Sequence, residues 1–463
     1  MRPWALALLV AGCAAAPLRH ATIPSPLDGT APRPPHEPRP PPEPIERPAR
    51  LTVHEAVLEA LAANRTVLVS RHGVAVADTR AVEARAVLWP EVRAVGTHKR
   101  LSEAPGISSP ELGVDFTLGP GETSAIDVEA SFPIFAFGRH LYAWRAARLA
   151  HRQAEADRDA VEADAAEAVT AAAYDLLETG RQIGVARSIE AALERQIKDA
   201  ASLFAAEKVT KDALLEAEVE WARARRDREK LESLLPLRRI ALNTLLGRPL
   251  DAPIEIVDAP VTAPPLVDGA GVLAARPESR HAELEVRRAD AALRSAIGAE
   301  LPQLRGVAAW HADDSDFSKP NDYGSLLLRL EIPLFRGGAG AARIRRARRE
   351  LDVARLGRAE TEARLLAAAA AARRGADEAY RDIAVAEQSV GKAEESHRIL
   401  QERFTVGRAT SRELLDSTAL LARTRFEHVR SLYSYNVALS RLHRALGGDP
   451  RLPPFPAPAG SIE

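Results

Sequence analysis

The chain has 463 residues, of which 46% are hydrophobic, 27% are charged and only 5% are aromatic, and its formal net charge is -1. A single cysteine excludes a disulfide scaffold and a cysteine-rich zinc site, and near-neutral charge argues against a polyanion as the main partner. After the N-terminus, no apolar run approaches the roughly 20 residues that a membrane helix needs, which excludes a polytopic helical membrane protein. A transmembrane β-barrel is not excluded, because its strands give only a weak pattern in the sequence.

The N-terminus predicts an exported lipoprotein. Residues 1–12 combine Arg2 with a short apolar run and are typical of a signal peptide. The run Val10-Ala11-Gly12-Cys13 resembles the bacterial lipobox, so we expect Cys13 to become the lipidated N-terminus, with palmitate among its acyl chains. The alternative is an ordinary signal peptide with an incidental cysteine. Residues 13–50 are rich in proline and predict an extended tether.

Prolines are absent from two long stretches. None occurs between Pro133 and Pro236, or between Pro333 and Pro450. Proline costs about 3 kcal/mol inside a helix, and both stretches are rich in Ala, Arg, Glu and Leu. They therefore predict two very long helical segments.

An internal repeat organises the chain. The sequence Phe132-Pro133-Ile134-Phe135 recurs 200 residues later as Ile332-Pro333-Leu334-Phe335, and the Leu-Gly pair at Gly247 recurs at Gly447. Upstream the offset is 212, as between Pro90 and Pro302, so the first copy has a longer loop. These offsets predict two structural repeats, a linker between them and a C-terminal tail. The proposed boundaries are 51–250, 251–266, 267–448 and 449–463.

Each repeat predicts the same elements. A first helix, capped by Thr52 with Glu55 three residues on, precedes two strands, a long helix, a turn and a shorter helix. At 1.5 Å per residue the long helix is about 100 Å and each short one about 55 Å, so two short helices stack end to end beside the long one. The expected ranges are helices 51–88, 139–206, 212–246 and 267–301, and strands 92–100, 126–132, 304–312 and 326–332.

The helices predict coiled-coil packing. Ile383, Val390, His397 and Phe404 are seven residues apart, which is the spacing of a left-handed supercoil. The strands alternate apolar and polar residues, as in 126–132, and each pair of strands is too small to be stable alone. One apolar face, open edges and an export signal predict a barrel shared between subunits.

The chain resembles the outer-membrane efflux factor (TolC-like) family. The residues that carry the resemblance are 51–57, the Phe-Pro-Ile-Phe and Ile-Pro-Leu-Phe strand ends, the turn 403–415 and the closing Leu-Gly pairs. The resemblance implies a mainly α fold with a small β part. Duplicated helical hairpins would form a trimeric periplasmic α-barrel, and four strands per chain would contribute to a shared outer-membrane β-barrel.

The resemblance also implies a function. A lipid-anchored homotrimer in the outer membrane of a Gram-negative bacterium would passively conduct substrates of an inner-membrane pump, coupled through a periplasmic adaptor protein. It would need no cofactor, perform no catalysis and bind no nucleic acid. Two alternatives stay open: the duct of a type I protein secretion system, and a structural periplasmic coiled-coil lipoprotein. The substrate class also stays open.

The resemblance places functional residues at the two hairpin tips. The constriction of the channel would use Glu413 and Asp416, which are solvated surface acids in the alternative interpretation. Because Gly407 corresponds to Glu207, we expect the first turn to adopt a different geometry. The expected adaptor contacts are Val209, Thr210 and Leu214 in the first tip, and Phe404, Val406, Gly407, Thr410, Ser411 and Leu414 in the second.

Other motifs indicate no site. The arginine-rich run 343–349 is interpreted as a solvated helix face, since the chain has 56 arginines against 7 lysines. Gly338-Ala339-Gly340 lacks the rest of a dinucleotide-binding loop, and the histidines lack metal-ligand spacing.

Overall fold

The computed structural model describes residues 49–104, 106–109, 114–117, 119–207, 209–257, 260, 272–314 and 320–452. The chain divides into two units, Met1–Arg47 and Pro48–Glu463, and all of the described residues belong to the second unit. The predicted signal peptide, Cys13 and nearly all of the tether lie outside the described residues.

Helices account for most of the described chain, and their lengths repeat. The long helices have 67 residues each, and the helices that return from the turns have 36 each. The two predicted long helical hairpins are therefore confirmed. The helices are α2 (Val53–Ala63), α3 (Arg65–Ala86), α4 (Arg139–Ala205), α5 (Lys211–Leu246), α6 (Val272–Ala275), α7 (Pro277–Gly298), α8 (Ala339–Thr405) and α9 (Ser411–Leu446).

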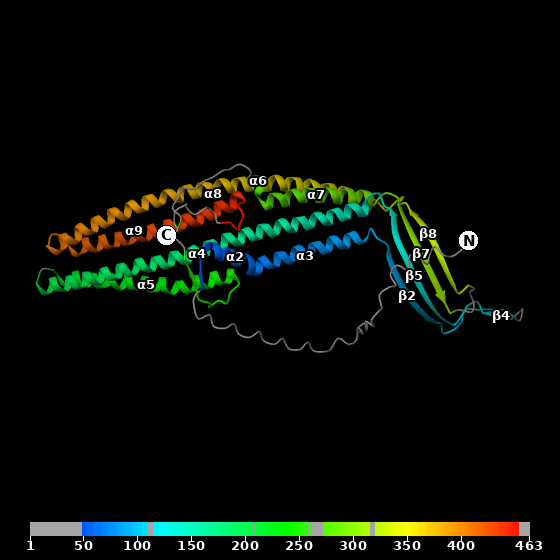
Figure 1. Cartoon of the computed structure of the whole chain (residues 1–463), viewed down its shortest axis with the longest axis horizontal. Coiled ribbons are helices and arrows are strands. Elements are labelled where there is room, and N and C mark those ends of the chain that lie inside the picture. The colour runs from blue at the N-terminus through cyan, green and yellow to red at the C-terminus, as the bar shows by residue number, and fades with distance from the viewer. Residues whose placement is uncertain are drawn as a thin grey trace. The chain divides into compact units, whose positions relative to one another are not determined.

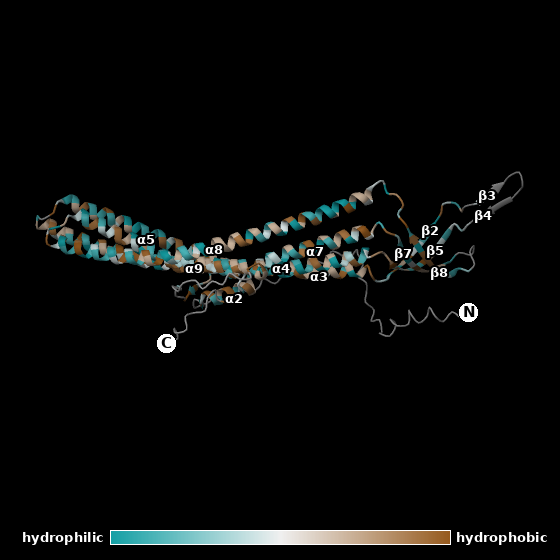
Figure 2. Cartoon of the chain, turned by 90° about the horizontal axis from the view of Figure 1, so that it is seen from above, coloured by the Kyte–Doolittle hydropathy of each residue, from teal (hydrophilic) through white to brown (hydrophobic). Residues whose placement is uncertain are grey.

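The long helices are held by stripes of apolar side chains. α4 packs against α3, α5, α7 and α9, and α8 packs against α7 and α9. Figures 1 and 2 show the two hairpins side by side, with apolar and polar residues alternating around each helix. The heptad positions Ile383 and Phe404 are buried, as are Leu421 and Leu442 on the returning helix. The predicted seven-residue packing pattern is confirmed at these positions.

The helix predicted over residues 51–88 is in fact two helices. Thr52 and Glu55 form the predicted capping box at the start of α2. The chain then breaks at Asn64, whose side-chain oxygen accepts hydrogen bonds from the backbone N–H groups of Thr66 (2.8 Å) and Val67 (3.3 Å). An uninterrupted helix was the wrong prediction, because an asparagine that caps a new helix satisfies donors that a continuous helix would satisfy itself.

The short helices meet end to end at matching places in the two repeats. The Asn64 side chain donates to the carbonyl of Leu245 at the end of α5 (2.7 Å), and Arg276 donates to the carbonyl of Arg444 at the end of α9 (2.6 Å). Burial alone raises the pKa of Glu278, but hydrogen bonds from Arg444 and Arg276 outweigh it and lower the pKa to about 2. These junctions agree with the predicted end-to-end arrangement. Residues 267–271 of the predicted second-repeat helix lie outside the described part.

Proline occurs inside one of the returning helices. α5 continues through Pro236, in agreement with the expected helix 212–246. Neighbouring residues explain why the helix is not broken there, since Leu235 packs against the core and Leu242 and Leu246 are fully buried. Tertiary packing therefore offsets the cost of the proline.

Four strands form one antiparallel sheet in the order β2-β5-β7-β8. The strands are β2 (Glu91–Arg100), β5 (Glu122–Phe135), β7 (Gln303–Asp313) and β8 (Asp322–Glu331). The central pair β5–β7 joins the two repeats and leaves β2 and β8 at the edges. All four predicted strands are confirmed.

Two smaller pairs of strands were not predicted. β3 (Gly106–Ser109) and β4 (Val114–Thr117) pair within the longer loop of the first repeat. β1 (Ala49–Leu51) runs parallel to β6 (Ile254–Ile256), about 200 residues away in the chain. Pairing between three-residue segments that are so distant leaves no periodic pattern in the sequence.

The sheet has one apolar face, which is exposed in the chain. Val128 lies opposite Trp310, and Leu328 lies opposite Gly306 on the same face. The exposed fractions of Trp310 and Leu328 are 45% and 64%. The other face is mainly polar, as where the Asp127 carboxylate lies 2.6 Å from His311 Nδ1. Among the described helices, none is both long and apolar enough to cross a membrane.

Candidate functional site

The two hairpin turns have the same backbone form. α5 and α9 each begin after a threonine in an extended conformation, with φ and ψ of -83° and 161° at Thr210 and -84° and 159° at Thr410. Three residues before each threonine the backbone takes a positive φ, which is +57° at Glu207 and +73° at Gly407. The expectation that Glu207 forces a different geometry is therefore wrong. The surrounding turn imposes the left-handed conformation on a residue that rarely adopts it.

The second turn carries a capping box that was not predicted. The Glu413 carboxylate accepts hydrogen bonds from the Thr410 backbone N–H (2.7 Å) and hydroxyl (2.9 Å), and the Glu413 N–H donates back to that hydroxyl (3.2 Å). These bonds, with a smaller contribution from Arg403, lower the pKa of Glu413. The Thr-x-x-Glu spacing that identified the cap at Thr52 was also the signal here. In the first turn the corresponding residue is Ala213, and Thr210 makes no capping bond with its side chain.

The residues expected to contact an adaptor divide into surface and interior groups. Thr210, Val406, Gly407 and Thr410 are exposed, and Val406 has an exposed fraction of 67%. Val209, Leu214 and Ser411 are half-buried, and the Ser411 hydroxyl donates to the carbonyl of Ala213 (3.4 Å), which links the two tips. Phe404 and Leu414 are buried, so within one chain they support the turn rather than forming its surface.

The two tips differ in how much apolar surface they expose. Phe204 is 41% exposed whereas Phe404 is 4% exposed, and Leu215 is 49% exposed whereas Leu415 is 8% exposed. Leu415 packs into a cluster with Ile189, Leu193 and Ala217 of the first hairpin. The first tip has no equivalent covering within its own described chain.

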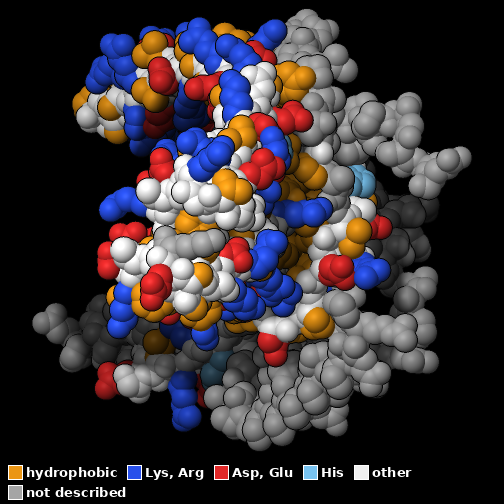
Figure 3. All heavy atoms as spheres, turned by 90° about the vertical axis from the view of Figure 1, so that its left-hand side faces the viewer, with side chains coloured by type: hydrophobic (Ala, Val, Ile, Leu, Met, Phe, Trp, Pro, Cys, Tyr) orange, Lys and Arg blue, Asp and Glu red, His pale blue; other side chains and the backbone are white. Residues whose placement is uncertain are grey.

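The two acidic residues of the expected constriction have different surroundings. Glu413 is engaged in the capping box, whereas Asp416, one turn further along α9, is exposed. Seen end-on from the hairpin tips, acidic, basic and hydrophobic side chains intermingle across the surface (Figure 3). Both carboxylates lie in the first two turns of α9, where the helix dipole favours negative charge.

A buried polar contact joins the two hairpins near the tips. The Gln196 amide of α4 donates to the Thr418 hydroxyl of α9 (2.7 Å), and His397 Nδ1 of α8 lies 3.0 Å from the Ser417 hydroxyl. Burial lowers the pKa of His397, and the positive charges of Arg425 and Arg195 lower it further. The neutral form of this histidine is therefore the one that suits the packed tips.

Within the described residues, no group of three or more His, Cys, Asp or Glu side chains is arranged to hold a metal ion.

The comparison with family models decides the family. The sequence model described as "Outer membrane efflux protein" matches residues 56–248 and 271–448. The chain belongs to the outer membrane efflux protein family. The two matched segments together cover most of the chain.

Solved structures of similar fold agree with the family. The chain is 19% identical to CusC, covering 86% of this chain and 92% of that one, with a TM-score of 0.77. It is 14% identical to the Campylobacter jejuni CmeC outer membrane channel, covering 86% of both chains, with a TM-score of 0.77. It is 18% identical to the Neisseria gonorrhoeae MtrE outer membrane channel, covering 86% and 89%, with a TM-score of 0.72. A comparison with curated sequences found no match.

Proposed function

We propose that the chain is the outer-membrane channel of a tripartite efflux system. Three copies would form a hollow duct through which an inner-membrane pump, coupled by a periplasmic adaptor, passes its substrates outward. Transport energy would come from the pump, so the chain needs neither a cofactor nor a catalytic residue. The observation that carries the proposal is a sheet whose exposed face is apolar, joined to two helical hairpins of about 100 Å.

The open sheet edges support a homotrimer. In the described chain β2 and β8 pair on one side only. An exposed strand edge is a template for pairing with another chain, and closure into a barrel removes it. Four strands from each of three copies give twelve, which is within the range of outer-membrane barrels. The exposed Phe204 and Leu215 would also find partners in such an assembly.

The apolar face of the sheet favours a channel over the alternative of a structural periplasmic coiled-coil lipoprotein. In such a lipoprotein a row of exposed leucines would only lower solubility, because exposed apolar patches cost solubility. In a barrel, that row faces lipid while the polar face lines the pore. Acylation at Cys13 would add an anchor in the same membrane.

We assign the remaining roles to the tips. The exposed residues Thr210, Val406, Gly407 and Thr410 are the proposed adaptor contacts, supported from beneath by Phe404 and Leu414. Asp416 and Glu413 are the proposed acidic constriction. Three copies of each would surround the pore axis with six carboxylates.

Two adjacent leucines of β8 give a matched test. Leu328 lies on the apolar face and Leu327 on the opposite face, and both are exposed. An arginine facing lipid costs about 2–4 kcal/mol. We expect Leu328→Arg to reduce the amount of oligomer, which is recognised in detergent by its dissociation on heating, and to reduce conductance in planar bilayers. Leu327→Arg should retain both. A wild-type protein that is monomeric and water-soluble without conductance would contradict the proposal, as would equal tolerance of both substitutions.

A further inference from the structure

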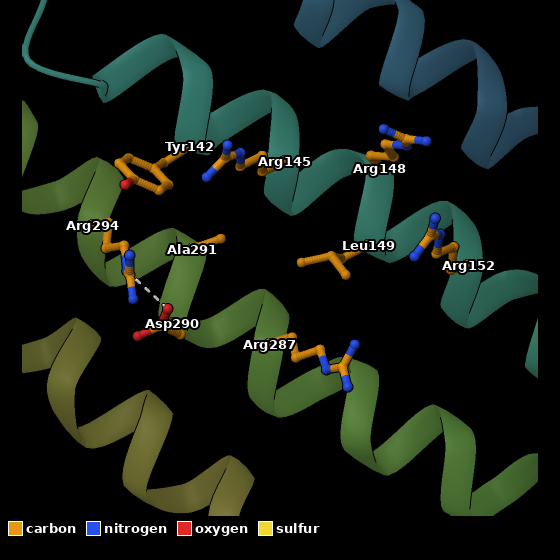
Figure 4. Close-up of a pocket in the computed structure, with 9 residues that line it drawn as sticks. All are labelled: Tyr142, Arg145, Arg148, Leu149, Arg152, Arg287, Asp290, Ala291 and Arg294. Carbon is orange, nitrogen blue, oxygen red and sulfur yellow. Dashed lines mark ion pairs between the residues drawn. The ribbon is translucent and has the colours of Figure 1, made fainter.

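A groove between α4 and α7 is lined largely by arginines. It has a volume of about 300 Å³ and lies on one face of the two helices (Figure 4). Its charged lining consists of Arg145, Arg148 and Arg152 from α4, and Arg287, Arg294 and Asp290 from α7. The lining therefore carries five positive charges and one negative charge. Like charges three and four residues apart on a helix repel each other, so the groove favours an anion.

The three groove arginines of α4 have no acidic partner among the described residues. Arg287 pairs with Glu283, and Arg294 pairs with Asp290 (2.9 Å). Among the residues that the structure describes, no carboxylate oxygen lies within 4.0 Å of the Arg145, Arg148 or Arg152 guanidinium. Two of the three lie against aromatic rings instead, Arg145 at 5.2 Å from the Tyr142 centroid and Arg148 at 5.9 Å from that of Trp144. Their donors stay available to a ligand.

The groove lies just beyond the ends of the strands. Arg145 and Arg152 are six and thirteen residues from the start of α4, which places them about 9 and 20 Å along the helix. The corner before α4 exposes Phe135. Tyrosine and tryptophan are typical of membrane interfaces. Long arginine side chains near such an interface extend towards the lipid headgroups.

Heptad spacing shows which side of the helices the arginines occupy. Arg145, Arg152 and Asp159 share one face of α4, and the Asp159 carboxylate pairs with Arg280 of α7. One turn further, Glu162 pairs with Arg451 of the segment after α9 (3.2 Å). If this side of α4 faced the lumen of the proposed duct, the segment packed on it would block the duct. Given the proposed function, on which this step depends, the arginines face outward.

We propose that this groove binds the phosphate of an anionic phospholipid from the periplasmic leaflet of the outer membrane. Guanidinium groups bind phosphate through paired hydrogen bonds, and basic pockets between helices bind the headgroups of anionic lipids. α4 and α7 follow and precede the central strands β5 and β7. Copies that join at the β2 and β8 edges therefore leave the groove open to lipid.

The test uses the full-length oligomer in detergent and native mass spectrometry. Wild-type protein is mixed with cardiolipin, phosphatidylglycerol or phosphatidylethanolamine, and retained lipid is measured. The groove variant carries Arg145→Gln, Arg148→Gln and Arg152→Gln. The matched control carries Arg346→Gln, Arg349→Gln and Arg355→Gln on α8, where each arginine already has an acidic partner.

We expect the wild type and the control to retain the two anionic lipids in preference to phosphatidylethanolamine. The groove variant should bind them about tenfold more weakly, which is about 1.4 kcal/mol. Equal retention by the groove variant, or no preference for anionic lipid, would each overturn the proposal. Heat-sensitive oligomers report folding, and Arg145→Gln alone replaces the triple variant if they are lost. Conductance is measured in parallel, so a wild type that binds lipid without conducting would refute the channel and not the lipid site.

Discussion

Glu207 occupies a backbone conformation that costs a non-glycine residue about 1–2 kcal/mol. Its φ of +57° matches that of Gly407 in the other repeat. We expect Glu207→Gly to stabilise the first tip by about 0.5–1 kcal/mol, because glycine removes the strain but loses more entropy on folding. Amide hydrogen exchange at the ends of α4 and α5 measures this as slower local opening.

Gly407→Ala is the matched control for this prediction. A methyl group at Gly407 would meet no atom within 4 Å, so the substitution changes the backbone preference alone. It should accelerate exchange at the second tip. Unchanged exchange in both variants would mean that the left-handed conformation carries no strain at either tip.

The titration of His397 gives a pH dependence at the same end of the molecule. Its pKa is lowered in the folded chain by burial and by Arg425 and Arg195, while Glu394 pairs with Arg425 (2.7 Å). As pH falls below the ordinary histidine value of about 6.5, the opened state takes up the proton more readily than the packed state. The packing of the tips is therefore fully stable above that value and weakens as pH falls.

Hydrogen exchange of the second tip should accelerate between neutral and mildly acidic pH, after correction for the intrinsic rate. His397→Gln keeps a polar side chain and removes the titration, so its corrected exchange should be independent of pH in this range. The same acceleration in the variant would assign the effect to another group.

Single residues also mark what sequence reasoning found and missed. The Thr-x-x-Glu spacing predicted the cap at Thr52. The same spacing occurs at Thr410, but its glutamate, Glu413, was interpreted only as part of the channel constriction. Asn64 gave no warning, since the apolar pattern continues across it and its role depends on a carbonyl 181 residues away. Phe404 is buried and Phe204 is exposed because the two tips pack differently between the hairpins. The sequence does not reveal this difference, because the two phenylalanines occupy equivalent positions in the repeat.

At the scale of elements, α5 contains a proline, Pro236, ten residues before its end. The residue removes one helix hydrogen bond and crowds the preceding turn. Ion pairs to α4 flank it, with Arg187 to Glu232 (2.8 Å) and Arg238 to Asp175 (2.7 Å), but exposed pairs contribute little. We expect Pro236→Ala to stabilise the hairpin by about 2 kcal/mol, measured as a higher Tm of the oligomer by circular dichroism.

Pro277 provides the comparison for Pro236. It is the first residue of α7, where proline is well tolerated because its missing N–H would have no partner in the helix. Pro277→Ala should leave Tm nearly unchanged. A lower Tm for Pro236→Ala would indicate that the packing of α5 against α4 depends on the proline.

Long elements were predictable because their patterns are local and repeated. Heptads and proline-free runs predicted both long helices, and the expected range 139–206 differs from α4 by one residue at its end. Period-two alternation predicted β5 and β8, and β2 and β7 were expected as their partners. The pairs β1–β6 and β3–β4 have three or four residues each. Segments this short carry no period, so only the folded chain reveals them.

At the scale of the whole molecule, the proposed threefold symmetry multiplies the effect of one charge. Asp416 is exposed near the second tip, and three copies would surround the axis. Acidic rings favour cations in narrow pores. We expect Asp416→Asn to lower the preference for cations over anions, measured as a reversal potential across a salt gradient in planar bilayers.

The effect of Glu413 can be distinguished from that of Asp416, although Glu413 also takes part in the capping box. Glutamine also serves at that position of a capping box, so Glu413→Gln removes the charge while the turn keeps its hydrogen bonds with Thr410. The double variant Glu413→Gln, Asp416→Asn should lose more cation preference than either single variant. Asp212→Asn, which removes an acidic side chain from the first turn of α5, should leave the reversal potential unchanged. An unchanged potential in the double variant would exclude both carboxylates from the constriction, whereas a change with Asp212→Asn would mean that both tips line it.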